Sequence, residues 1–170
     1  SSALKVYVLD QTNVYRMNAD LSTKEATTAH AGWVVTAIAQ ATNTLVYAIK
    51  NILYQINNAG TISTVLSDIP YGTVIKKIYY YNDLLYVFGQ LWPDVFIYQC
   101  SYDGSVYSVN YTHSKEDMTI YDMAGSGGKM YWVSNVWLYQ TSGIESIKLK
   151  KQSFTSSARC SFYRDDFLYI

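Results

Sequence analysis

The side chains that most often carry chemistry are few in this chain and stand far apart. There are two cysteines, Cys100 and Cys160, and two histidines, His30 and His113. A zinc site usually draws its ligands from closely spaced pairs of cysteines or histidines, and no such pair occurs. The sequence therefore predicts no metal site and no cofactor. We also expect two free thiols, because the repeat described below puts the cysteines in units that are not neighbours.

Acidic side chains could support hydrolysis of a glycan, which requires two carboxyl groups facing each other across the bond. Asp165 and Asp166 are adjacent in the sequence, and adjacent side chains on a strand point to opposite faces. His113, Lys115, Glu116 and Asp117 are close together in the sequence, a pattern more typical of a solvated loop than of an acid-base cluster. The chain also lacks a Gly-x-Ser-x-Gly elbow and a phosphate-binding glycine loop. We therefore expect a protein that is not an enzyme.

The composition limits the choice of partner. The chain has 170 residues, 13 basic and 13 acidic, and 16% of it is aromatic, including 18 tyrosines. A formal net charge of zero provides no field to hold nucleic acid or an anionic membrane surface. No apolar run approaches the roughly 20 residues that a membrane-spanning helix needs. The length is that of one domain, 1–170.

A repeat of about 40 residues organises the whole chain. Its first marker is a tyrosine between apolar residues, and the steps from one tyrosine to the next are 40, 39, 45 and 38 residues. The five copies are Val6-Tyr7-Val8, Val46-Tyr47-Ala48, Leu85-Tyr86-Val87, Met130-Tyr131-Trp132 and Leu168-Tyr169-Ile170. The second marker keeps the same period, at Val14-Tyr15-Arg16, Leu53-Tyr54-Gln55, Ile97-Tyr98-Gln99 and Leu138-Tyr139-Gln140.

Two further strands complete each unit. One follows the second marker after a turn, at 61–66, 105–110 and 144–149. The other precedes the next tyrosine marker, at 32–39, 73–80, 117–124 and 158–163. Each unit is thus four short antiparallel strands, rich in β-branched and aromatic residues and separated by Gly, Asn and Asp. The units are approximately 1–30, 31–71, 72–116, 117–156 and a partial 157–170.

These units predict an all-β fold, a β-propeller with about four repeats. A sheet of this size cannot bury both of its faces alone, whereas sheets stacked around an axis cover one another. The alternative is a β-sandwich, which does not require two markers at a constant period. Two arrangements stay open. The strand at 158–163 could close a four-bladed ring with the N-terminal unit, or the chain is a piece of a larger propeller.

Residues 72–81 followed by Asn82-Asp83-Leu84-Leu85-Tyr86-Val87 resemble the blades of NHL and YWTD β-propellers. So do Phe96-Ile97-Tyr98-Gln99, Asp103-Gly104-Ser105 and Lys129-Met130-Tyr131-Trp132-Val133. The full YWTD tetrapeptide is absent, since Tyr131-Trp132-Val133-Ser134 stands in its place. The resemblance implies a propeller that binds or scaffolds other molecules more often than it catalyses a reaction.

The strand order also predicts where a ligand binds. Loops that join second to third strands share one rim with the loops that join fourth strands to the next unit, and these are the longer ones. Loops held by a rigid scaffold carry most binding sites. The loops are expected at 27–31, 67–71, 90–94, 111–116 and 151–156, and the candidate binding residues on them are His30, Tyr71, Trp92, His113 and Phe154, respectively. Trp92 is the sharpest candidate, because its loop, 90–94, is the lengthened one and Pro93 stiffens it.

The leading interpretation is a non-enzymatic module that binds a protein partner through this rim, because tyrosine gives large contact area at small entropic cost. The alternative is a lectin with repeated sugar sites, and a glycan-cleaving enzyme ranks third. Association into a homo-oligomer stays open. The glycosylation pattern Asn110-Tyr111-Thr112 slightly favours an extracellular or secreted protein.

Overall fold

The computed structural model describes residues 5–9, 13–18, 20–29, 34–41, 44–57, 60–103, 105–115, 120–126, 128–134, 137–142, 150–153, 162–164 and 167–169. Within these ranges every regular element is a β-strand, and strands that follow one another within a sheet pair antiparallel. The all-β prediction is therefore confirmed for the part of the chain that the structure describes.

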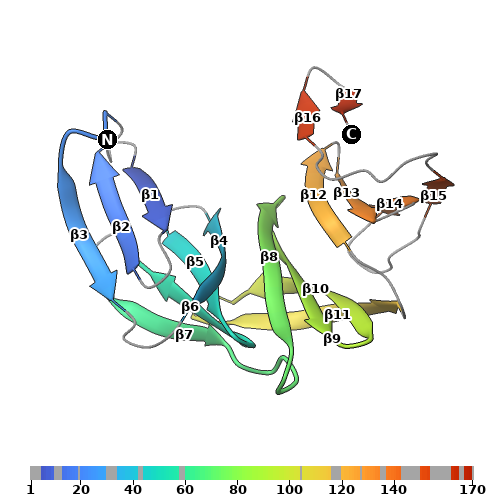
Figure 1. The fold of residues 1–170 in the computed structure, drawn as a ribbon, viewed down its shortest axis with the longest axis horizontal. Helices are drawn as coiled ribbons and strands as arrows, with labels where there is room; N and C mark the ends of the chain where they lie inside the picture. The colour runs from blue at the N-terminus through green and yellow to red at the C-terminus, as the bar shows by residue number, and fades with distance from the viewer. Residues whose placement is uncertain are drawn as a thin grey trace.

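The strands form five sheets in chain order (Figure 1). Sheet I contains β1 (Lys5–Leu9), β2 (Asn13–Asn18) and β3 (Lys24–Ala29). Sheet II contains β4 (Val35–Ala41), β5 (Thr44–Ile49), β6 (Ile52–Ile56) and β7 (Ile62–Leu66). Sheet III contains β8 (Val74–Tyr81), β9 (Leu84–Leu91), β10 (Asp94–Tyr102) and β11 (Tyr107–Lys115). Sheet IV contains β12 (Ile120–Ser126), β13 (Lys129–Ser134), β14 (Trp137–Ser142) and β15 (Lys150–Ser153), and sheet V contains β16 (Phe162–Arg164) and β17 (Phe167–Tyr169).

Four antiparallel strands per unit, as predicted, are present in sheets II, III and IV. Each begins with the strand that precedes the tyrosine marker, and the marker strand pairs with it. The connection from β8 to β9 shows how the sequence forms these hairpins. Asn82 and Asp83 both have positive φ, 52° and 60°, which are the angles of a type I′ turn. Asparagine and aspartate tolerate this conformation better than other residues with a side chain.

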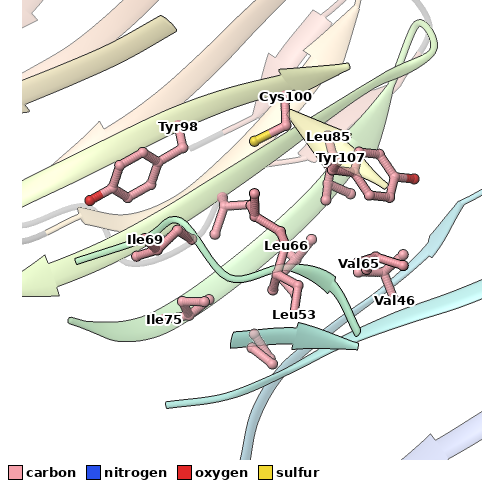
Figure 2. Close-up of a cluster of buried hydrophobic side chains, with 14 of the residues drawn as sticks. Val46, Leu53, Val65, Leu66, Ile69, Ile75, Leu85, Tyr98, Cys100 and Tyr107 are labelled. Carbon is pink, nitrogen blue, oxygen red and sulfur yellow. The ribbon is translucent and has the colours of Figure 1, made fainter. Parts of the chain in front are cut away.

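A buried apolar cluster lies between each pair of neighbouring sheets from I to IV. The cluster between sheets II and III includes Leu66, Ile75 and Cys100, and Figure 2 shows side chains of both sheets converging there. A second cluster joins sheets III and IV around Trp132, and a third joins sheets I and II around Tyr47. Burial of this surface is the main force that holds the sheets together.

The middle strands show why the tyrosine of the first marker is flanked by apolar residues. On β9, Leu85 and Val87 pack toward sheet II, whereas Leu84, Tyr86 and Phe88 pack toward sheet IV. A strand buried on both faces needs a continuous apolar run and not an alternating one. The sequence pattern therefore follows from the stacking of sheets, as predicted.

The two ends of the chain do not close a ring in this structure. β16 pairs with β17, not with β1, and sheet V lies next to β12 (Figure 1). Among the described strands, sheet I has the order β1-β2-β3, and none of them pairs with β1 as an inner strand. The sheets are thus stacked as propeller blades are, in an open arrangement.

Several predicted boundaries were wrong. β11 continues to Lys115, although 111–116 was expected to be a loop. β3 continues to Ala29, into the loop expected at 27–31. β15 pairs with β14 at 150–153, overlapping the loop expected at 151–156, whereas the strand expected at 144–149 lies outside the described residues. An outer strand of an antiparallel sheet is partly exposed to solvent, so it tolerates polar residues, and its sequence resembles that of a loop.

The cysteines and membrane-spanning helices were also subjects of sequence predictions. Cys100 is a buried free thiol, as expected, whereas Cys160 lies outside the described residues. Among the described residues, no helix is long and apolar enough to cross a membrane.

Candidate functional site

The candidate site is a set of exposed apolar side chains on the rim that carries the turns from second to third strands. It consists of Val34, Tyr71, Val74 and Trp92, which we call the apolar rim. Their exposed fractions are 60%, 90%, 39% and 80%. Among the described residues, no other large hydrophobic side chain is as exposed as Tyr71 and Trp92.

Trp92 lies in the turn between β9 and β10. Leu91 pairs with Asp94, so only Trp92 and Pro93 connect the two strands, through a cis peptide bond. The prediction of a lengthened loop was therefore wrong, because it is the strands that are long, at 8 and 9 residues. A two-residue turn at the end of a long hairpin has little freedom to move, so it holds the Trp92 indole in place on the rim.

Tyr71 lies in the connection from β7 to β8, where the sequence predicted a loop. The backbone N–H of Thr73 donates a hydrogen bond of 3.1 Å to the carbonyl of Pro70, which closes a turn around Tyr71 and Gly72. Gly72 has φ of +90°, a conformation that glycine adopts at little cost. The side chain of Asn51 donates a hydrogen bond of 2.8 Å to the carbonyl of Ile69, and this ties the connection to the turn between β5 and β6.

The turns of Tyr71 and Trp92 pack against each other. A Cβ atom placed on Gly72 would lie 3.2 Å from Cδ1 of Leu91, the residue before Trp92. Deeper in the sheet, a Cβ atom on Gly89 would lie 2.6 Å from Cγ2 of Thr73. Gly72 and Leu91, far apart in the sequence, are thus brought close together, and the turns of Tyr71 and Trp92 lie at the same edge of sheet III.

The base of these turns is tightly packed. Thr73 is buried beneath the Tyr71 turn, and its hydroxyl neighbours that of Tyr98 on β10. Burial raises the pKa of Tyr98, and the Thr73 hydroxyl partly opposes that shift. Figure 2 shows Tyr98 beside Ile69, which belongs to the connection from β7 to β8. The turns that carry Tyr71 and Trp92 therefore pack on buried side chains.

Val34 and Val74 extend the rim toward the inner strands. Val74 is the first residue of β8, and Val34 directly precedes β4. Val35 pairs with Ile49, and the carbonyl of the next residue, Lys50, accepts a hydrogen bond of 3.3 Å from the N–H of Ile75. Lys50 therefore lies between the starts of the two inner strands, with a valine on either side. The strands themselves lie side by side (Figure 1).

Of the three predicted binding residues that the structure describes, two lie near each other. Tyr71 and Trp92 are neighbours on the rim. His113 lies within β11, where its backbone is opposite Ile97, and so was wrongly placed in a loop. His30 and Phe154 lie outside the described residues. Val34 and Val74 were not singled out from the sequence, because a valine in a strand usually indicates core.

Among the described residues, the charged groups on the inner strands β8 and β12 are Lys76, Lys77 and Asp122. Lys77 of β8 forms a salt bridge with Asp122 of β12, so these two charges compensate each other. Lys76 is exposed on β8, two residues after Val74. It occupies a β-bulge, since Ile75 pairs with Gly89 and Lys77 pairs with Phe88. Asp68 is exposed on the connection from β7, toward the outer edge of the sheet.

The repeated glutamines have different structural roles. Nε2 of Gln55 on β6 lies 3.5 Å from the hydroxyl of Tyr102 on β10, a hydrogen bond between sheets II and III. Nε2 of Gln99 donates to the hydroxyl of Tyr86 within sheet III, at 3.3 Å. The side chain of Gln140 is not among those described. Among the described residues, no group of three or more His, Cys, Asp or Glu side chains could hold a metal ion.

Comparison with solved structures supports the fold. The chain is similar to a chain of the mitotic checkpoint complex, with a TM-score of 0.73 and 13% identity over 95% of this chain and 50% of that one. It is similar to virginiamycin B lyase from Staphylococcus aureus, with a TM-score of 0.66 and 13% identity over 99% and 59%. For PorZ of the type-IX secretion system of Porphyromonas gingivalis the TM-score is 0.65, with 10% identity over 96% and 21%.

These structures are propeller-like repeat proteins, and they share the all-β architecture at low identity. The chain spans 50%, 59% and 21% of the lengths of these three chains, respectively. A shorter similar chain is the computationally designed Ika4 protein, of which 85% is covered with a TM-score of 0.61 and 10% identity. No protein-family model and no curated protein sequence matches the chain. The similarity thus establishes stacked propeller-like sheets and leaves the number of blades open.

Proposed function

We propose that this protein is a non-enzymatic binding module that holds a protein partner through the apolar rim. The observation that carries the proposal is the contact between the turns of Tyr71 and Trp92, whose side chains are 90% and 80% exposed. Exposed apolar side chains grouped on a rigid base are typical of interaction surfaces. Tyrosine and tryptophan are also the residues that most often dominate the binding energy at protein interfaces.

The similar structures support this interpretation at the level of fold. One is a chain of the mitotic checkpoint complex, and another is described as a surface component of a secretion system. Both descriptions concern proteins that work within larger assemblies. A propeller-like scaffold that presents contact residues on one rim is consistent with the same kind of role.

A lectin is the second candidate, favoured by the exposed indole of Trp92, which could stack on a sugar ring. Repeated sugar sites would place an aromatic residue in the equivalent turn of each unit. The sequences between the corresponding strands are Asp10-Gln11-Thr12, Lys50-Asn51 and Asn135-Val136, none of them aromatic. The valines of the rim also cannot hydrogen-bond sugar hydroxyls. Glycan cleavage is the third candidate and would require turnover by the purified protein.

Site-specific crosslinking tests the proposal. A photoreactive amino acid is placed at position 71, at position 92 or, as a control on the opposite rim, at Val106, which is 40% exposed. In an extract of the source organism, positions 71 and 92 should crosslink to the same protein, and position 106 should not. The purified partner should then bind wild type and lose affinity for Trp92→Ala. Equal crosslinking from all three positions would contradict the proposal, and saturable binding on a glycan array that Trp92→Ala abolishes would favour the lectin.

A further inference from the structure

We infer that one face of sheet I is an interface with a second copy of this chain, which continues the stack of sheets and closes it into a ring of two copies. This face carries Val6, Val8, Tyr15 and Met17, and we call it the uncovered face. The inference does not involve the apolar rim, so it can fail while the proposed function holds. It comes from a rule that sheets II, III and IV follow.

The rule concerns the strands that carry the first tyrosine marker. In sheets II, III and IV, the second and fourth residues of this strand lie in the cluster shared with the preceding sheet. These residues are Leu45 and Tyr47 on β5, Leu85 and Val87 on β9, and Met130 and Trp132 on β13. All six are at most 2% exposed. The preceding sheet therefore covers the same positions in each of the three units.

Sheet I presents the same positions without a preceding sheet. The second and fourth residues of β1 are Val6 and Val8, and Val8 is 41% exposed. Tyr7, between them, packs with the cluster that joins sheets I and II, so the two valines belong to the opposite face. On β2, Met17 pairs with Val6 and Tyr15 pairs with Val8, and directly paired residues share a face. Four apolar side chains thus lie where sheets II, III and IV have an interface between sheets.

The occupant that matches this face is another sheet of the same kind. An apolar patch on a protein surface usually marks an interaction site. Sheet V lies at the other end of the stack (Figure 1), and its strand β17 pairs with β16, not with β1. A second copy offers its C-terminal sheets to the uncovered face of the first. The length agrees, since this chain spans 50% of the mitotic checkpoint complex chain and 59% of virginiamycin B lyase, so two copies have about the length of one such chain.

The contact is head to tail. Nζ of Lys24 lies 5.1 Å from the centroid of the Tyr15 ring, so the uncovered face carries a positive charge. If the uncovered faces of two copies met, their Lys24 side chains would be brought together, and like charges oppose association. A head-to-tail contact joins two different surfaces, as the stacked sheets of this chain already do. Two such contacts close a ring when the rotation between the copies allows it.

Sedimentation velocity of the full chain, over a wide range of concentration, tests the association. Wild type should form a particle of twice the chain mass of 19.3 kDa. Val8→Lys should weaken this association by at least about tenfold, because it places a charge in an apolar contact. Val106→Lys is the matched control, since Val106 is 40% exposed and precedes β11, away from sheet I. This control and Trp92→Ala should associate as wild type does, and circular dichroism checks that each variant is folded.

Crosslinking locates the contact without changing its charge. A chain with heavy isotopes and a photoreactive amino acid at position 8 is mixed with unlabelled chain. Mass spectrometry should find crosslinks from position 8 of one copy to the C-terminal sheets, 120–169, of the other.

A chain that stays monomeric at every concentration would overturn the inference and leave the uncovered face to further sheets of a longer polypeptide. Association that a folded Val8→Lys variant leaves unchanged would overturn it as well. Crosslinks within one copy, or between the two copies of sheet I, would exclude the head-to-tail contact. Particles that keep growing with concentration would exclude a closed ring of two.

Discussion

The N–H of Gly128 donates a hydrogen bond of 2.9 Å to the hydroxyl of Tyr81, and so joins the hairpin of sheet IV to the inner strand of sheet III. The ring of Tyr81 lies flat against Gly125 in that hairpin. A Cβ atom on Gly125 would lie 2.6 Å from Cδ1 of Tyr81, closer than real carbon atoms approach. Glycine at this position therefore permits the two sheets to stack.

Gly125→Ala should destabilise the protein by about 1–3 kcal/mol, because the new methyl group forces the Tyr81 ring away. Tyr81→Phe keeps the ring and removes only the hydrogen bond, and should cost about 1 kcal/mol. Urea unfolding followed by circular dichroism measures both. A Gly125→Ala variant as stable as wild type would mean that sheets III and IV do not stack through this contact.

Much of the fold could be predicted from the sequence because stacked sheets leave a strong pattern. Tyr47 and Tyr86 lie in strands buried on both faces, so every neighbour is apolar and the period is visible. The outer strands leave a weaker pattern. β11 is the outermost strand of sheet III, and its residues Thr112 to Lys115 resemble a loop in sequence, although backbone pairing with β10 holds them in the sheet.

The candidate site was predicted only in part. Tyr71 and Trp92 could be found, since aromatic residues beside proline and glycine indicate exposed turns. The contact between their turns, at Gly72 and Leu91, depends on how the two connections fold, which sequence alone does not fix. Val34 and Val74 are exposed because they begin the inner strands, where a neighbouring sheet no longer covers them. Nothing in the sequence distinguishes an exposed valine at the start of a strand from a buried one.

Tyr86 offers a test of the buried tyrosines. Tyr86→Ala should cost about 3–5 kcal/mol, since its ring fills the cluster between sheets III and IV. Tyr131 is only partly buried, so Tyr131→Ala should cost less, below about 3 kcal/mol. Tyr86→Phe keeps the ring but removes the acceptor for buried Gln99, at about 1–3 kcal/mol. Equal small losses in all three variants, measured by urea unfolding, would show that the strand assignments are wrong.

Cys100 should be unreactive in the folded protein. Burial disfavours the charged thiolate and raises the pKa of this thiol to about 12, and the thiolate is the form that reacts with thiol reagents. In a Cys160→Ser background, an aromatic disulfide reagent at about pH 8 should release no colour from the native protein and one equivalent after denaturation. Rapid labelling under native conditions would show that sheets II and III open at this position.

Asp103 makes the stability depend on pH. Hydrogen bonds from the N–H of Val106 and from the N–H and hydroxyl of Ser105 lower its pKa from the usual 3.8. Because the folded pKa lies below the unfolded one, this contribution is complete above about pH 4 and is lost as the pH falls through the folded value. Asp103→Asn retains an acceptor without the titration. The gap between the urea midpoints of wild type and Asp103→Asn should therefore change between about pH 5 and pH 2, and a constant gap would count against the effect.

Removing the rim side chains should leave the fold intact. Tyr71 and Trp92 bury little surface, so Tyr71→Ala, Trp92→Ala and the double variant should each unfold within about 0.5 kcal/mol of wild type. Leu85→Ala, in the core between sheets II and III, should instead cost about 2–5 kcal/mol. This contrast distinguishes side chains that serve binding from side chains that stabilise the fold. If Trp92→Ala destabilised the protein as much as Leu85→Ala, the indole would be part of the packing, and the apolar rim would lose its main argument as a binding surface.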